Sequence, residues 1–343
     1  MQTERSRAML ILPLLGGILL LAFLFSFIWG RYDVPFHEVP RILLNALLSP
    51  FSLGLSPTWT ENMAVVVINI RLPRILLACL VGGCLSMAGA AFQSVFQNPM
   101  AAPDILGASS GACFGAALAI LLNFSKGGIT ALSFVSSLVT VALVYLIGRR
   151  ARGSRRIGIL LAGIMVGSLF SSATSYVKLV ADPNSQLPAI TYWLMGSLGG
   201  ARLSDIAFVL WPMLLGAVPL LLLRWRLNLL TIPEEEALSM GVRIHVLRLC
   251  VILCATLLTA SAVSVSGMIG WVGLVIPHLS RKLVGHNGKY LLPASLLMGA
   301  LFLLLVDNLS RNLLAAELPI GILTAIVGAP FFLYLMTRKE ACL

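Results

Sequence analysis

Long apolar runs alternate with short polar segments along almost the whole chain. Roughly 20 helical residues cross a bilayer core of about 30 Å, and most of the apolar runs reach that length. The pattern predicts an all-α polytopic membrane protein, built as a single transmembrane domain over residues 1–343. Ten transmembrane helices are expected at residues 8–29, 64–96, 101–122, 129–148, 157–180, 205–223, 244–266, 272–285, 291–313 and 319–337.

The first apolar run and the run at 244–285 each allow more than one interpretation. The first resembles a secretory signal peptide, but it is longer than about 20 residues and lacks a small-x-small cleavage site, so we expect a retained span. The second is about twice the length of one span. Because Gly267, Gly270 and Gly273 weaken a helix there, we predict a break at 267–271 between a full span and a shorter one.

Composition and charge support a membrane location and argue against a nucleic-acid partner. Only 11% of the residues are charged and 59% are hydrophobic, whereas a soluble domain carries about 25% charged residues. The net charge of +11 comes largely from short basic segments between apolar runs, such as 149–156. Ten spans place most of these segments on one side, and by the positive-inside rule both termini are predicted to be cytoplasmic.

The sequence lacks the motifs of the common catalytic and metal sites. There is no GxxxxGKS or GxxxxGKT phosphate loop, no HExxH and no GxSxG. The 4 histidines are dispersed, and the 6 cysteines lie almost entirely in apolar runs without a CxxC pair. We therefore predict no catalytic residue, no metal site and no cofactor bound by this chain.

One polar segment, residues 227–243, is predicted to face the cytoplasm between two spans. A proline suits the first position of a helix, acidic residues suit its first turn, and a glycine suits its end. The segment carries these residues in that order: Pro233, Glu234, Glu235, Glu236 and Gly241. From the chemistry alone, it is either a capped connecting loop or a short docking helix for a cytoplasmic partner.

Three arginines, Arg71, Arg74 and Arg311, are predicted at the outer ends of spans. Such residues either extend toward lipid headgroups or offer a basic surface to an acidic partner, and the chemistry alone leaves both open. Asp307 precedes Arg311 by one helical turn and is expected to form a structural ion pair with it. Asp104 is expected near the start of a helix, where an acid is favourable.

Small residues recur at every fourth position in two of the predicted spans. Gly107 and Gly111 begin a GxxxGxxxG series, and Gly163 and Gly167 form GxxxG. Such glycines let helices approach closely in lipid. They also suit a pathway that passes a large solute without gripping it, so a packing role and a pathway role are both open.

Several long strings, in order along the chain from Arg71 onward, resemble the FecCD-type permeases of type II ABC importers. This class includes the cobalamin, haem and ferric-siderophore permeases. The strings are RLPR (71–74), FQNPMAAPDILGASSGA (96–112), YWLMGSLGG (192–200), SGMIGWVGLVIPHLSR (266–281), LLPASLLMGA (291–300) and ELPIGILTAIVGAPFFLYL (317–335). The resemblance identifies the family specifically, but it says little about which substrate is transported.

The resemblance implies the type II ABC importer permease fold, in the cytoplasmic (inner) membrane of a bacterium or archaeon. It implies a homodimer, or a pair with a closely related permease, within the lipid bilayer. Two cytoplasmic ATPase subunits would bind the ATP, and an extracytoplasmic substrate-binding protein would deliver the ligand. The corresponding positions in this sequence are Arg71, Arg74 and Arg311 for docking of the binding protein, 233–241 for coupling to the ATPase, and Asn98 and Met100 for the cytoplasmic gate.

The implied function is ATP-driven import of an iron chelate by alternating access, with a ferric siderophore as the first candidate. Haem, cobalamin or another corrinoid, and molybdate are the alternatives within the family. The loop around 156–158 is more basic than expected for the cobalamin members. An ion-driven secondary transporter is the alternative class, and the lack of a deeply placed, unpaired acid argues against it.

Overall fold

The computed structural model describes residues 2–48, 57–150, 155–232, 243–314 and 316–337, and every regular element within them is helical. This confirms the all-α prediction. The helices are α1 (Gln2–Ser26), α2 (Glu38–Leu48), α3 (Glu61–Val65), α4 (Leu72–Phe96), α5 (Ala108–Leu121), α6 (Lys126–Arg149), α7 (Arg155–Val180), α8 (Gln186–Leu194), α9 (Leu203–Leu222), α11 (Ile244–Ser266), α12 (Val272–Val284), α13 (Gly288–Asn312) and α14 (Ile320–Thr337). The π segment η2 (Val66–Arg71) and the 3-10 segments η3 (Pro103–Leu106) and η4 (Arg226–Thr231) join them.

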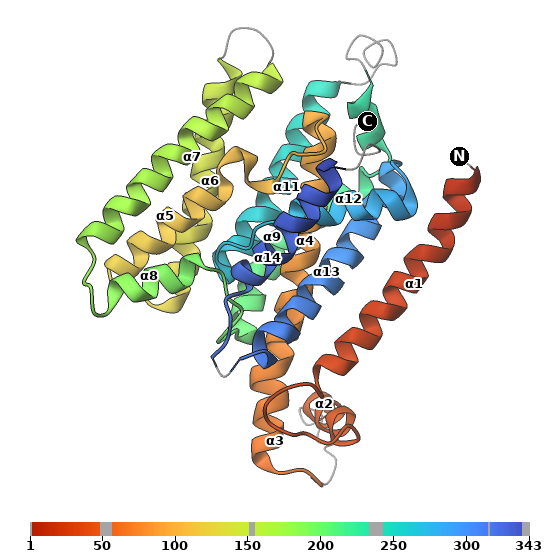
Figure 1. Cartoon of the computed structure of the whole chain (residues 1–343), viewed down its shortest axis with the longest axis vertical. Coiled ribbons are helices and arrows are strands. Elements are labelled where there is room, and N and C mark those ends of the chain that lie inside the picture. The colour runs from red at the N-terminus through yellow and green to blue at the C-terminus, as the bar shows by residue number, and fades with distance from the viewer. Residues whose placement is uncertain (1, 49–56, 151–154, 233–242, 315, 338–343) are drawn as a thin grey trace.

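Each predicted span has a helix at its position, but the helices differ in length. Within the described residues, 7 helices are long and apolar enough to cross a bilayer, α5 and α14 contain shorter apolar helices, and α12 has only 13 residues. A multi-pass arrangement follows, while the count of ten crossings stays a prediction. α1 begins and α14 ends at the same end of the bundle, where α6 ends and α7 begins (Figure 1). Following the predicted orientation, we call this the inner end, and the end that carries α2 and α3 the outer end.

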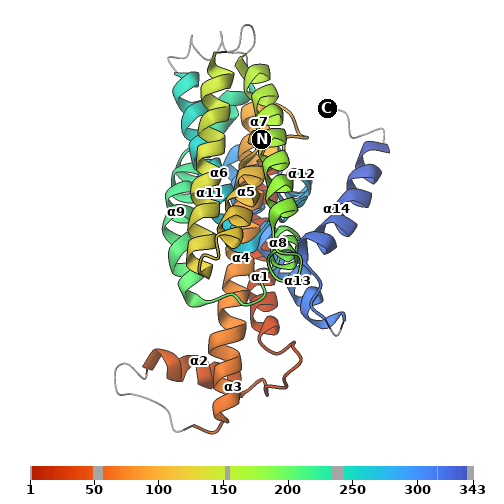
Figure 2. The ribbon, with the colours of Figure 1, turned by 90° about the vertical axis from the view of Figure 1, so that its left-hand side faces the viewer.

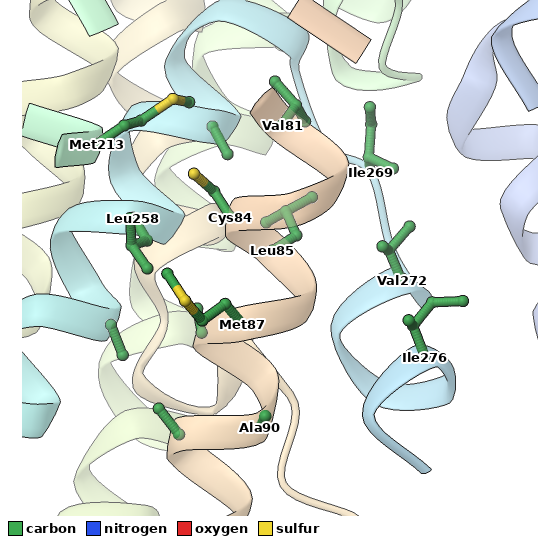
Figure 3. Packing of buried hydrophobic residues seen from close by; sticks show 14 of the residues in the cluster. Val81, Cys84, Leu85, Met87, Ala90, Met213, Leu258, Ile269, Val272 and Ile276 are labelled. Carbon is green, nitrogen blue, oxygen red and sulfur yellow. The ribbon is translucent and has the colours of Figure 1, made fainter. Parts of the chain in front are cut away.

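α4 runs through the middle of the protein (Figure 1). α4 belongs to a longer continuous helical segment. Because other helices surround α4, 83% of the most apolar 18-residue stretch of that segment is buried. Figure 3 shows part of this packing, in which Cys84 and Met87 of α4 lie among side chains of α9, α11 and α12, including Met213 and Leu258. This core fixes the position of α4, and with it the loops at both of its ends.

Glycines on α4 allow its backbone to touch the neighbouring helices. A Cβ added at Gly82 would lie 2.3 Å from the carbonyl oxygen of Gly299 on α13. A Cβ added at Gly89 would lie 1.8 Å from the carbonyl oxygen of Gly273 on α12. Both contacts need hydrogen as the side chain, since real Cβ atoms do not approach other atoms so closely.

α5, α6, α7 and α8 form a second group of helices, and α1 and α14 lie at the edges of the protein. α5, α6 and α7 pack side by side, with α8 across the outer end of α5 (Figure 1). α1 lies at one edge against α13, and α14 leans away from the bundle toward its inner end (Figure 2). Among the described residues, α7 and α14 therefore have much surface without a neighbour.

The predicted break at 267–271 is confirmed. α11 ends at Ser266 and α12 begins at Val272, as the glycines of this stretch suggested. Gly267 adopts φ 68° and Trp271 adopts φ 70°, both in the left-handed region. The bulky Trp271 was not expected there, and its ring packs 6.2 Å, between centroids, from that of Phe332 on α14.

Two helices differ in extent from the spans predicted at their positions. The span predicted at 64–96 belongs to a continuous helical segment, Glu61–Phe96, of 36 residues. Such a helix is about 54 Å long, so α3 and η2 project beyond the bundle together with α2 (Figure 2). The span predicted at 101–122 contains a helix only from Ala108, because Pro103 starts a 3-10 turn that Gly107 ends at φ 71°.

Candidate functional site

A cluster of buried charges lies at the outer end, where α4 packs against α13. The guanidinium of Arg74 donates to Asp307 Oδ1 at 2.9 Å and to both carboxylate oxygens of Glu317 at 2.9 Å. Arg311, one turn after Asp307, places its Nε 3.2 Å from Asp307 Oδ2. Asp307 is 0% exposed, and Arg74 and Arg311 are 5% and 8% exposed. Two cations therefore share one carboxylate inside the protein.

Arg71 and Arg31 fasten the connection after α1 to the same region. Arg71 is 3% exposed and donates to the backbone carbonyls of Phe27 and Tyr32. Arg31 donates from Nε to the Arg311 carbonyl at 3.1 Å. Arg31 is exposed, but the buried guanidinium of Arg71 is satisfied by backbone carbonyls, which lowers the cost of taking it out of water.

This geometry turns the three predicted docking arginines toward partners within the chain. The expected ion pair of Asp307 and Arg311 is confirmed. The contribution of Arg74 was missed, because Arg74 and Asp307 are 233 positions apart and no local pattern links them. A role of Arg71, Arg74 and Arg311 in docking stays a prediction, and direct ion pairs with another protein would require the cluster to open.

The two predicted gate residues lie in the loop between α4 and η3 at the inner end. α4 is followed by Gln97, whose backbone is left-handed at φ 50°, a common way to end a helix. Asn98 Oδ1 then accepts a hydrogen bond from Met100 N at 2.9 Å and closes a tight turn. Met100 is 44% exposed. The loop is thus an ordered turn with an exposed tip, and its action as a gate stays a prediction.

The predicted glycines meet where η3 and α5 pack against α6 and α7. These residues are Gly107, Gly111, Gly163 and Gly167. A Cβ added at Gly111 would lie 2.0 Å from Thr140 Oγ1 of α6, and one at Gly163 would lie 2.2 Å from the Ile105 carbonyl oxygen of η3. The backbone of Gly107 faces that of Gly167. Gly111 and Gly163 thus lie where a Cβ would not fit, whereas a Cβ at Gly167 would meet nothing closer than 3.6 Å. A pathway role for the four glycines stays a prediction.

Two cavities lie beside this glycine contact. One, of about 380 Å³, is bordered by polar α7 residues including Ser168 and Ser171. The other, of about 550 Å³, lies between α4, α11, the 267–271 segment and α14, and its lining is mostly apolar. Asp104 borders both cavities, and its Oδ1 accepts a hydrogen bond from Ser109 N at 3.0 Å, so it also caps α5. Neither lining contains Lys or Arg.

Comparison with known proteins identifies the family. The model of the FecCD transport family matches residues 18–338. The chain belongs to this family. The FecCD permease is 41% identical over 303 residues to the molybdate import system permease protein MolB of Haemophilus influenzae, with 88% of each chain covered. It is 40% identical over 280 residues to a probable iron chelatin transport system permease protein of Helicobacter pylori, with 82% of this chain and 85% of the relative covered.

A solved structure shares the whole fold of the FecCD permease. It is described as an inward-facing conformation of a transporter assigned to the metal-chelate ABC type, and it matches with a TM-score of 0.83 and 39% identity. The match covers 95% of this chain and 98% of that chain. These likenesses confirm the family expected from the sequence. The chain is a multi-pass membrane permease subunit and not an enzyme, and the ATPase activity lies in a separate subunit.

None of the five residues predicted to couple the FecCD permease to the ATPase is described by the structure. Pro233, Glu234, Glu235, Glu236 and Gly241 lie outside the described residues. The described element before them is η4, in which Leu227 and Leu230 are each 1% exposed. The coupling role of the five residues stays a prediction, but the chain that leads to them is anchored in the core.

Side chains suited to metal binding do not gather within the described part of the FecCD permease. No group of three or more His, Cys, Asp or Glu there could hold a metal ion. The five described cysteines are free, and they are Cys79, Cys84, Cys113, Cys250 and Cys254. The chemistry of the described residues is therefore that of packing, capping and ion pairing.

Proposed function

We propose that this FecCD permease is the membrane subunit of a binding-protein-dependent ABC importer that carries an iron chelate, a ferric siderophore first, into the cell. The observation that carries the proposal is the likeness to the metal-chelate type transporter over 95% of the chain at a TM-score of 0.83. Family members named for molybdate, iron chelatin, haem and cobalamin import are all similar. The importer class thus has stronger support than any one ligand, and an ion-driven secondary transporter has none.

The lining of the two cavities favours a large chelate over a small free oxyanion. A dehydrated oxyanion needs cationic or N–H donors close by, and neither cavity is lined by Lys or Arg. Hydroxyl groups of Ser168 and Ser171 and apolar side chains such as Trp271 and Ile326 offer weak contacts. Weak contacts suit a bulky solute that must pass without being held. Molybdate remains the second candidate because of the 41% identity to MolB.

The proposed assembly is a dimer of this chain with two ATPase subunits. α7 and α14 carry exposed apolar residues that no described helix covers, among them Met165 and Leu169 on α7 and Ile326 on α14. A second copy placed against α7 and α14 would bury part of this surface and enclose a pathway along the cavities. The rest of the apolar surface would face lipid.

The proposed mechanism is alternating access powered by ATP. A loaded binding protein docks at the outer end, and ATP binding closes the two ATPase subunits at the inner end. The motion enters the permease through residues 233–241. Asn98 and Met100 then open or close the pathway toward the cytoplasm, while α7, packed on η3 through glycine, shifts around the dimer axis.

Uptake by cells that lack only this gene tests the function and the ligand together. Labelled ferric siderophores, haem, cobalamin and molybdate are supplied in parallel, and the gene is then restored. Loss of ferric siderophore uptake, regained with the gene, supports the proposal. Loss of molybdate uptake alone would move the ligand to the second candidate. Import that persists without ATP would contradict the importer class.

A further inference from the structure

Hydrogen bonds join three segments at the inner end: the end of α4, η4, and the turn between α12 and α13. Gln97, directly after α4, donates from Nε2 to the Leu230 carbonyl of η4 at 2.6 Å, across 133 positions of sequence. Asn228 of η4 donates from Nδ2 to Asn287 Oδ1 at 3.0 Å, and its Oδ1 accepts from the backbone N–H of Gly288 at 2.7 Å. The inner ends of α4 and α13 are therefore bonded to the same short element.

η4 is anchored both in the hydrophobic core and against the start of α13. Leu227 and Leu230 are buried in the main hydrophobic core. A Cβ added at Gly288 would lie 2.5 Å from the Arg224 carbonyl oxygen, so the chain entering η4 passes directly against the start of α13. With these contacts, a displacement of η4 would also displace the elements bonded to it.

Gln97 occupies the joint between α4 and the gate loop, which we define as residues 98–100. Its left-handed backbone ends the helix, and Asn98 follows at once. One turn earlier, Gln93 donates to the Leu274 carbonyl of α12 at 3.3 Å, so α4 has a separate attachment of its own. The bond from Gln97 to Leu230 therefore acts on the start of the loop more than on the helix.

We propose that Gln97 is a positioning residue that carries motion of η4 to the gate loop. The inference rests on the proposed function, because η4 leads in sequence into residues 233–241, the segment predicted to receive force from the ATPase. Displacement of that segment moves η4, and the amide of Gln97 moves the gate loop with it. Through its bonds to Asn287 and Gly288, Asn228 moves the start of α13 together with η4. Without the amide, motion of η4 reaches the gate loop less directly.

The test measures the gate loop directly and needs no knowledge of the ligand. Met100→Cys is introduced after the 6 native cysteines are replaced, and the full complex with its ATPase subunits is placed in lipid nanodiscs. Labelling of the new cysteine by a polar maleimide is timed without nucleotide and with ATP, Mg²⁺ and vanadate. Gln97→Met removes the donor, Gln97→Lys retains one of similar reach, and Thr231→Val is the control, since it removes only a bond within η4.

The expected result is a nucleotide-dependent labelling rate in the parent and in Thr231→Val. In Gln97→Met the nucleotide effect shrinks by about five-fold, because the hydrogen bond to the Leu230 carbonyl is lost, while ATP hydrolysis and complex assembly persist. Gln97→Lys recovers it. An undiminished effect in Gln97→Met, or equal loss in Gln97→Lys, overturns the inference. Failure of the parent to bind an ATPase or to respond to nucleotide would instead contradict the proposed function.

Discussion

Asp307 on α13 accepts a hydrogen bond from Arg74 on α4 at 2.9 Å, and Asp307 is 0% exposed. The same carboxylate faces Arg311, so it balances part of the positive charge that two helices bring into the protein. A buried charge is costly when it loses its partner, because neither water nor another ion replaces the lost contact. Asp307 is therefore the residue on which this cluster most depends.

Replacing Asp307 should destabilise the protein strongly. Asp307→Asn keeps the shape but leaves Arg311 without a carboxylate, and loss of one partner of a buried pair costs about 3–5 kcal/mol. Glu317→Gln is the matched control, since its side chain is 37% exposed and should cost about 1 kcal/mol or less. Thermal unfolding of the purified chain in detergent measures both. Equal melting temperatures for the two variants would show that the buried cluster contributes little.

The same cluster predicts the outcome of changing the three outer arginines. If Arg71, Arg74 and Arg311 act only by docking, their joint replacement by Glu gives a folded complex that the binding protein no longer stimulates. Because all three are buried and paired within the chain, we expect misfolding and loss of assembly instead. Gel filtration and binding-protein-stimulated ATP hydrolysis separate the outcomes. A well-assembled triple variant without stimulation would favour direct docking.

The helical fold and the break at 267–271 could be predicted because both depend on local sequence. Apolar length marks a span, and closely spaced glycines mark its interruption. The start of α5 at Ala108 was harder to predict, because a 3-10 turn closed by Gly107 has the same apolar composition as a helix. The left-handed Trp271 had no local signal, since its conformation depends on packing against α14.

The candidate sites were predictable only in part, for a related reason. Arg311 and Asp307 share a helix face, so their spacing predicts the pair. Arg74 reaches Asp307, and Gln97 reaches Leu230, across 233 and 133 positions, which no periodic pattern links. The side-chain directions of the outer arginines depend on these distant partners, so the sequence placed them at span ends without showing that they are buried.

The contact between α4 and α13 gives a prediction about packing. A Cβ at Gly82 would lie 2.3 Å from the Gly299 carbonyl oxygen, so Gly82→Ala must push the helices apart and should cost about 1–3 kcal/mol. Gly16→Ala on α1 is the control, because nothing lies within 4 Å of the added Cβ, and alanine is favoured over glycine in a helix by about 1 kcal/mol. Melting in detergent should fall for Gly82→Ala and hold or rise for Gly16→Ala. The reverse order would contradict the close helix contact.

Charge reversal in the predicted coupling segment should separate ATP hydrolysis from uptake. Replacing Glu234, Glu235 and Glu236 by Lys removes the acids that favour a helix start and inverts the surface offered to the ATPase. We expect intact membrane insertion, because these residues precede α11 and lie outside the spans, with uptake lost while hydrolysis continues. Charge reversal of Arg149 and Arg150, at the inner end of α6, is a control at a site not predicted to couple. Uptake per ATP in proteoliposomes measures the effect. Unchanged uptake per ATP would leave the segment as a capped connecting loop.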